Sequence, residues 1–182
     1  MGCCNSSEGN VVKVEPAMSK TSTTIAGKKE VFNIEEYKMR VLLKHNELRN
    51  KHNSPELQIN EELNSMAQEY AKKLFESNNN KKKYFSFNTY KDSFLGENIL
   101  IAKKKTPEDI CRQWYEENKN YNYSLNKLQN NTAHFTQMIW KNTKEIGIGF
   151  HFDDDKNNCL VVYYYPAGNI LGEFSNNIQK PN

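Results

Sequence analysis

The sequence predicts an α+β domain in which helices cover an antiparallel sheet. Three observations support this fold class. Apolar residues recur at helical spacing in the first half of the chain, two segments near the C-terminus alternate apolar and polar positions, and the length of 182 residues with 37% hydrophobic residues suits one domain with a core. We therefore expect a flexible tether over residues 1–31 and a folded domain over residues 32–182.

Two amphipathic helices are expected to open the domain. Asn33 and Glu36 have the spacing of an N-cap and its capping-box partner, and a second helix should begin near Asn60. The predicted core-facing stripes are Ile34, Tyr37, Val41, His45 and Leu48 in the first helix, and Leu63, Met66, Ala67, Tyr70, Ala71 and Leu74 in the second. The run Asn78–Lys83 is predicted to be an exposed loop that follows the second helix.

The second half of the domain should contain two more helices and a hairpin. Thr106, Pro107 and the acids after them form a helix start, and this helix should continue toward Tyr121. Residues 132–140 read as another short helix. Residues 146–152 and 160–165 alternate like paired strands, with a polar loop between them.

Charge and hydropathy exclude two classes of protein. A net charge of +3 and a pI near 8.5 are too mild for an obligate nucleic-acid binder, so no nucleic-acid partner is expected. The longest apolar runs, residues 99–102 and 160–165, are far shorter than the roughly 18 residues of a membrane-spanning helix. We therefore expect no segment that crosses a membrane.

The first six residues carry an acylation signal. Gly2 follows the initiator methionine and Ser6 lies four positions further on, which is the pattern of N-myristoylation. One myristoyl chain binds membranes only reversibly, and Cys3 and Cys4 offer sites for a second anchor by S-palmitoylation. A metal-binding or disulfide-forming cysteine pair is the alternative, but adjacent cysteines lack the usual spacing of metal sites. The sequence thus predicts a peripheral, lipid-anchored protein.

The cysteine content agrees with a cytosolic location. No basic start followed by an apolar stretch precedes Phe32, so no secretory signal is recognised. Cys111 and Cys159 alone remain in the body of the chain, and a reducing compartment would keep them as buried free thiols. The expected location is the cytosolic face of a Golgi, endomembrane or plasma membrane.

Three polar residues lie where apolar residues would be expected. Glu117 follows Ile110 and Trp114 on one helical face, His134 begins a helix with an otherwise apolar stripe, and Glu97 lies in a predicted loop just before an apolar run. A carboxylate on a buried face needs a partner. Taken singly, each residue also fits a capping role or a core hydrogen bond.

Several longer segments resemble the CAP superfamily (cysteine-rich secretory proteins, antigen 5, pathogenesis-related 1). The resemblance extends from about Phe32 to the C-terminus, and residues 133–143 are its most specific part. The matching segments are His45-Asn46-Glu47-Leu48-Arg49, Gly96-Glu97-Asn98-Ile99, Trp114-Tyr115-Glu116-Glu117, Ala133-His134-Phe135-Thr136-Gln137-Met138-Ile139-Trp140-Lys141-Asn142-Thr143 and Tyr164-Tyr165-Pro166-Ala167-Gly168-Asn169.

The resemblance implies an α-β-α sandwich with a cleft lined by two histidines and two glutamates, which holds zinc or another divalent cation in some members. Glu97, Glu117 and His134 match three of these positions, whereas Phe85 stands in place of the fourth, a histidine. One histidine with two carboxylates is a poor zinc ligand set, so at most weak binding of a divalent cation is expected. His45 is similar to a structural histidine of the family, and His52 and His151 have no motif support as substitutes.

Acylated members of the superfamily further imply peripheral attachment to cytosolic membrane faces, binding of anionic phospholipid or sterol, and a homodimer. Secreted members place a cysteine where this chain has Val162. That difference agrees with a protein free of disulfides.

Three functions are compatible with these features. The first is a membrane-tethered module that binds lipid or protein. The second is a hydrolase or metal-dependent enzyme that uses the Glu/Glu/His cleft, but no nucleophile motif and no His-Glu-x-x-His sequence is present. The third is calcium binding through Asp153, Asp155 and Asn157, where the glycine and glutamate of an EF-hand loop are missing.

Overall fold

The computed structural model describes residues 33–79, 89–152 and 157–182. The predicted tether with Gly2, Cys3 and Cys4 lies outside these ranges, as do Phe85 and the two aspartates of the considered calcium loop. The roles predicted for these residues therefore stay predictions.

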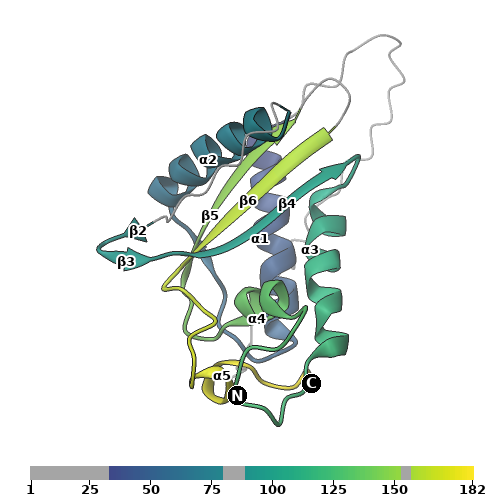
Figure 1. The fold of residues 1–182 in the computed structure, drawn as a ribbon, viewed down its shortest axis with the longest axis vertical. Helices are drawn as coiled ribbons and strands as arrows, with labels where there is room; N and C mark the ends of the chain where they lie inside the picture. Colours follow the sequence, from purple (N-terminus) through teal and green to yellow (C-terminus); the bar gives the residue numbers. More distant parts are fainter. Residues whose placement is uncertain (1–32, 80–88, 153–156) are drawn as a thin grey trace, which may run out of the picture. The chain divides into compact units, whose positions relative to one another are not determined.

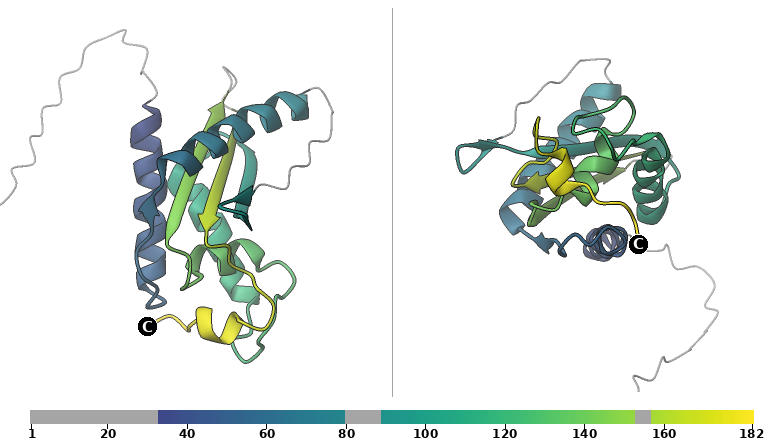
Figure 2. Two further views of the ribbon diagram at one scale, coloured as in Figure 1. Left: turned by 90° about the vertical axis from the view of Figure 1, so that its left-hand side faces the viewer. Right: turned by 90° about the horizontal axis from the view of Figure 1, so that it is seen from below.

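The described chain forms three layers, with helices on both faces of a sheet (Figures 1 and 2). One face is covered by α2 and the other by α1, α3 and α4. The helices are α1 (Ile34–Asn50), α2 (Glu61–Asn79), α3 (Pro107–Tyr115), α4 (Ala133–Ile139) and α5 (Phe174–Asn177), and a 3₁₀ helix, η1, spans Glu116–Asn120. The predicted α+β class and sandwich are therefore confirmed.

The main sheet has the strand order β1-β5-β6-β4. Its three long strands are antiparallel, as predicted, and the short β1 adds a parallel edge beside β5. A separate two-stranded ribbon pairs β2 with β3. The strands are β1 (Gln58–Ile59), β2 (Thr89–Tyr90), β3 (Ser93–Phe94), β4 (Gly96–Lys103), β5 (Glu145–Phe152) and β6 (Asn157–Tyr165).

Side-chain caps fix the starts of two helices where the sequence placed them. The Asn33 side chain accepts hydrogen bonds from two backbone N–H groups of the first turn of α1. Thr106 and Asp109 form a reciprocal capping box at the start of α3, with Pro107 in the first turn.

Three sequence predictions were wrong in detail. Ile34 does not join the buried stripe of α1 but is exposed, because it occupies the first turn. The third helix does not continue to Tyr121 as α-helix; it tightens into η1 after Tyr115. Glu97 lies within β4 and not in a loop, since this strand pairs with β6 from Gly96 onward.

The strand alternation divides the core into two parts. The even-numbered residues of β6, such as Leu160 and Val162, pack with α1, α3 and α4. The odd-numbered residues, such as Val161 and Tyr163, pack with α2. Each sheet face thus buries its own apolar set, which fixes the register of the strands.

Two glycines let α2 approach the sheet closely. A Cβ atom built on Gly147 would lie 2.3 Å from the backbone of Leu63, and one on Gly149 would lie 2.1 Å from the backbone of Ala67. Such distances are far inside van der Waals contact, so only glycine fits at these two positions. The backbone of α2 therefore rests directly on β5.

Side chains of α2 also occupy the edge of β5 where β1 ends. Asn64 Oδ1 accepts the Ile148 N–H at 2.7 Å. Four residues further on, Gln68 Oε1 accepts the Phe150 N–H at 3.1 Å, and Gln68 Nε2 donates to the Phe150 carbonyl at 2.8 Å. These amides replace the hydrogen bonds of a neighbouring strand, and so protect an edge that could otherwise pair with another chain.

Arg49 is buried and donates hydrogen bonds to four backbone carbonyls. Its guanidinium donates to the carbonyl of Pro55 at 2.8 Å, to those of Met138 and Trp140 at 2.9 Å, and to that of Thr143 at 3.0 Å. No carboxylate pairs with it among the described residues, and burial lowers its pKa to about 10. The charge is compensated by carbonyl dipoles alone, so each of these contacts matters for stability.

Replacing Gly149 with alanine should destabilise the domain. The added methyl group would collide with the Ala67 backbone, and we expect the free energy of unfolding to fall by about 1–3 kcal/mol. Urea unfolding followed by circular dichroism measures this change. Gly172→Asn is the control, because a side chain there meets open space and asparagine tolerates the positive φ; equal losses in both variants would contradict the packing argument.

Replacing Arg49 with lysine should destabilise the domain at least as much, although the charge is kept. A lysine has a single nitrogen and cannot reach four carbonyls in different directions, so we expect a loss of about 3 kcal/mol or more in unfolding free energy. The matched control is Arg112→Lys on the exposed side of α3. If both variants unfold at the same urea concentration as the parent, Arg49 does not have the role assigned to it.

Candidate functional site

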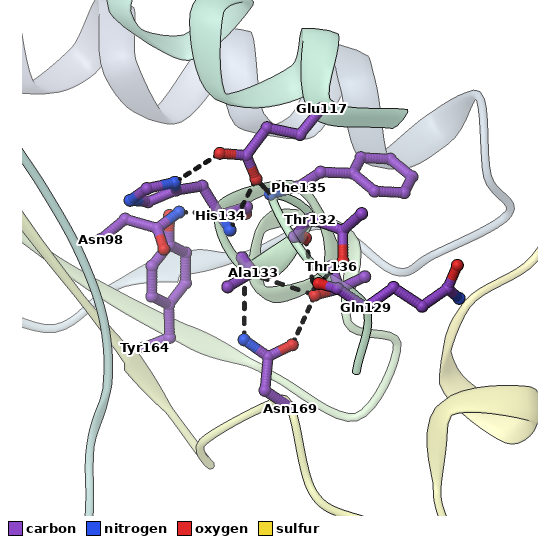
Figure 3. A network of polar contacts seen from close by, with 10 residues as sticks. All are labelled: Asn98, Glu117, Gln129, Thr132, Ala133, His134, Phe135, Thr136, Tyr164 and Asn169. Atoms are coloured by element: carbon purple, nitrogen blue, oxygen red, sulfur yellow. Dashed lines mark hydrogen bonds and ion pairs between the residues drawn. The ribbon is translucent and has the colours of Figure 1, made fainter. Parts of the chain in front are cut away.

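The candidate site surrounds the first turn of α4, which carries His134 (Figure 3). Glu117 reaches this turn from η1, and Asn98 reaches it from β4. Residues from three distant parts of the sequence thus meet at one short helix.

Glu117 caps α4 and holds the imidazole of His134 at the same time. Its Oε2 atom accepts the backbone N–H groups of His134 at 2.9 Å and Phe135 at 3.2 Å. Its Oε1 atom lies 2.6 Å from His134 Nδ1 (Figure 3). Beside an ionised carboxylate, Nδ1 carries the proton, so Glu117 sets both the tautomer and the orientation of the ring.

Trp114 packs against the imidazole ring of His134. The two ring centroids are 5.8 Å apart with an interplanar angle of 11°, so the rings are stacked. The His134 side chain is 39% exposed and that of Glu117 is 20% exposed. Among the described residues, none forms a hydrogen bond with His134 Nε2, which leaves this nitrogen available to solvent or a ligand.

A chain of buried hydrogen bonds supports the other side of the helix. Asn98 Nδ2 donates to the His134 carbonyl and to the Tyr164 hydroxyl, each at 3.1 Å. Tyr164 in turn lies 2.8 Å from His45 Nε2, and His45 Nδ1 lies 2.8 Å from the Val41 carbonyl. Burial lowers the pKa of His45 to about 4, so this histidine is neutral and links α1 to the sheet.

The segment after β6 is attached to the same helix. Asn169 Nδ2 donates to the Ala133 carbonyl at 3.0 Å, and Asn169 Oδ1 lies 2.6 Å from Thr136 Oγ1. The buried Gln137 accepts the Gly168 N–H at 2.8 Å. Asn169 adopts a positive φ of 58°, which asparagine tolerates better than most residues.

Sequence reasoning did not assign roles to Asn98, Tyr164 or Asn169, although all three fall in the segments that resemble the CAP superfamily. Their partners are 33 to 119 residues away in the chain. Contacts over such separations cannot be predicted from the pattern of neighbouring residues.

Glu97 is placed differently from the other two candidates. It is exposed and lies opposite Tyr163 in the strand register. Consecutive strand residues leave the backbone toward opposite faces, so Glu97 points to the face that α2 covers, whereas Asn98 points toward α4. Its carboxylate contributes to raising the pKa of the buried Tyr163, after the larger effect of burial.

The ligand geometry of a metal site is not present in the described part of the chain. No group of three His, Cys, Asp or Glu side chains there is arranged to hold an ion. Both oxygens of Glu117 already take part in hydrogen bonds, Oε2 with the backbone of α4 and Oε1 with His134, so a cation would compete with these contacts. The residues present do not fit a zinc centre of the usual kind.

The remaining histidines and cysteines have structural surroundings. His52 lies 2.6 Å from the Gln179 carbonyl and 2.9 Å from the Tyr115 hydroxyl. His151 packs against Phe75. The two cysteines of the domain body, Cys111 and Cys159, are free and buried, which confirms the prediction made for them. No described helix has the length and apolar character needed to cross a membrane.

Known proteins share this fold and much of the sequence. The family model for the cysteine-rich secretory protein family, CAP, matches residues 42–165. The human Golgi-associated plant pathogenesis-related protein 1 is 37% identical over 144 residues, which cover 78% of this chain and 91% of that protein. The mouse GLIPR1-like protein 1 is 31% identical over 70% of this chain and 58% of its own length.

Solved structures agree in fold. The Schistosoma mansoni venom allergen-like protein 4 superposes with a TM-score of 0.58 at 23% identity, covering 79% of this chain and 94% of that one. NaASP2, solved with Zn²⁺, superposes with a TM-score of 0.57 at 21% identity over 81% of this chain and 87% of its own. From the family model and the identity to its relatives, the chain belongs to the CAP family of cysteine-rich secretory proteins.

Proposed function

We propose that this protein is a membrane-tethered CAP domain that acts as a lipid- or protein-interaction module on the cytosolic face of a membrane. The acylation signal at Gly2, Cys3 and Cys4 is the observation that carries the proposal. The name of the human relative, Golgi-associated, is consistent with a membrane of the secretory pathway.

The geometry of the candidate site favours binding over catalysis. Glu117 is engaged by two backbone N–H groups and one imidazole, so it is not a free general base. Its contacts hold α4 in place. A surface that must be rigid to recognise a partner gains from such a cap, whereas a hydrolytic site would also need a nucleophile.

One observation supports a hydrolase as the second candidate. A carboxylate that orients an imidazole through Nδ1 and leaves Nε2 open is the arrangement of a general base. No serine, threonine or cysteine of the described chain forms a hydrogen bond with Nε2. The pair alone could activate water only, and this makes the hydrolase the weaker proposal.

Replacing Gly2 with alanine should move the protein from membranes to the soluble fraction. The substitution removes the amine that accepts myristate, and palmitoylation at Cys3 and Cys4 depends on prior membrane contact. The measurement is ultracentrifugal fractionation of cells that express the full chain. Gly9→Ala, a glycine substitution outside the signal, serves as the control and should remain on membranes.

The double variant Cys3→Ser, Cys4→Ser separates the two anchors. It keeps the myristate and loses the second signal, so an intermediate distribution is expected. Retention of the Gly2→Ala protein on membranes at the parental level would defeat the anchor proposal.

Zinc titration of the full chain by calorimetry should give weak binding or no heat. His134 is the one imidazole at the site, and an ion at Glu117 would compete with the hydrogen bonds of this carboxylate to His134 and to the backbone of α4. A site of micromolar affinity or better that disappears in His134→Ala would show that the cleft binds metal after all. His151→Ala is the matched control, since that histidine packs against Phe75 away from α4.

A further inference from the structure

Four exposed aliphatic side chains belong to two loops, one before α4 and one between β6 and α5. Both loops run at the end of the domain that carries α5 (Figures 1 and 2). Leu171 is 79% exposed, the highest value among the large apolar residues described as exposed. Ile170 precedes it in the loop after β6, and Leu125 and Leu128 lie in the loop before α4, each of the three being 40–44% exposed. We refer to these four residues as the apolar tip.

The two loops are joined by Asn126. Its Nδ2 atom donates to the Gly172 carbonyl at 2.9 Å, and its Oδ1 atom accepts the Ser175 N–H at 2.9 Å. Leu125 and Leu128 flank this asparagine in the sequence, so the clamp brings their loop beside Ile170 and Leu171. The four residues of the tip therefore belong to two segments that hydrogen bonds hold together.

Leu171 projects from a tight turn that is fixed at both ends. The Glu173 N–H donates to the Ile170 carbonyl at 3.1 Å, which closes a four-residue turn around Leu171 and Gly172. Gly172 has a φ of 84°, the conformation that the third position of a type II turn requires and that glycine adopts most readily. Asn169 attaches the start of this turn to α4, as Figure 3 shows. The leucine is thus presented on a rigid support.

The loops around the tip carry little charge. Residues 122–131 and 166–173 contain one lysine, Lys127, and one glutamate, Glu173, in a chain of which 26% of residues are charged. Their other polar residues are asparagine, glutamine, serine and tyrosine, whose uncharged groups enter the headgroup layer of a bilayer at low cost. Lys127 is exposed between Leu125 and Leu128 and would face anionic headgroups.

We propose that the apolar tip inserts into the interfacial layer of a phospholipid bilayer and orients the domain on the membrane. This inference rests on the proposed function, which brings the chain to a membrane. An exposed leucine at a turn corner exposes apolar surface to water, and this surface is removed when the side chain enters the acyl region. The sparse charge around it means that few ionic groups must be desolvated on insertion.

Fluorescence of tryptophan replacements tests the insertion directly, when the signal is read as the difference from the parent chain with its buried Trp114 and Trp140. The full chain is produced without N-myristoyltransferase, so that no acyl chain contributes, and mixed with phosphatidylcholine vesicles with and without phosphatidylserine. In Leu171→Trp we expect a blue shift and quenching by brominated acyl chains. Leu43→Trp is the matched control, because Leu43 is 60% exposed on α1 and should stay unquenched.

A charge at the same position measures the contribution to binding. Leu171→Asp should weaken partitioning of the unacylated chain onto vesicles about tenfold or more, while Leu43→Asp should leave it unchanged. Near-parental binding by Leu171→Asp, together with no quenching of the introduced indole in Leu171→Trp, overturns the proposal. A change of oligomeric state in Leu171→Asp without lipid also overturns it, because a second copy would then cover the tip.

The outcome for the tip is separable from that for the anchor. Should the acylated chain stay on membranes while Leu171→Trp shows no quenching, the tip is refuted and the acyl anchor stands. Should Gly2→Ala leave fractionation unchanged while Leu171→Trp is quenched in vesicles, the anchor is refuted and the tip is supported.

Discussion

The placement of α4 depends on opposite charges at its two ends. The carboxylate of Glu117 accepts backbone N–H groups at the first turn, and the guanidinium of Arg49 donates to the carbonyls of Met138 and Trp140 at the last. A helix of seven residues has little stability of its own, and both charges also match the helix dipole. These two side chains, on η1 and α1, stabilise a short helix to which residues of the sheet and of the loops bind.

The role of Glu117 as the cap of α4 limits the chemistry that the candidate site can perform. A carboxylate that caps a helix is held in one position, and moving it away would leave two partly buried N–H groups without this acceptor. The same carboxylate fixes the ring of His134 against Trp114. The imidazole is held in one orientation and is partly exposed, which suits recognition of a ligand, and no hydroxyl or thiol of the described residues forms a hydrogen bond with its Nε2 atom.

Features with a local cause could be predicted from the sequence. The N-caps Asn33 and Thr106 bind backbone groups within three positions, and the alternation of residues 146–152 follows from the two-residue period of a strand, so propensity and periodicity identify them. The exposure of Ile34 and the 3₁₀ helix after Tyr115 were not predicted. Apolar periodicity does not show which turns of a helix pack against other elements.

Long-range contacts needed the structure. The two-residue strand β1 is recognisable only from its pairing with β5, and Glu97 could be assigned to a strand only once its register with Tyr163 was known. At the candidate site, the residue types Glu117 and His134 were found from the pattern and the family resemblance, while the atoms that Glu117 contacts could not be. Which backbone groups a carboxylate satisfies depends on tertiary packing that no single segment encodes.

The apolar tip and α4 are mechanically continuous. Asn169 joins the turn that presents Leu171 to the first turns of the helix that Glu117 and Arg49 hold. If the tip enters a bilayer, the membrane contact would therefore be linked to α4. The accessible Nε2 atom of His134 would then keep a fixed orientation relative to the lipid surface. Acyl chains on a tether confine a domain near a membrane without orienting it. A rigid second contact supplies the orientation that recognition of a lipid or a protein at that surface requires.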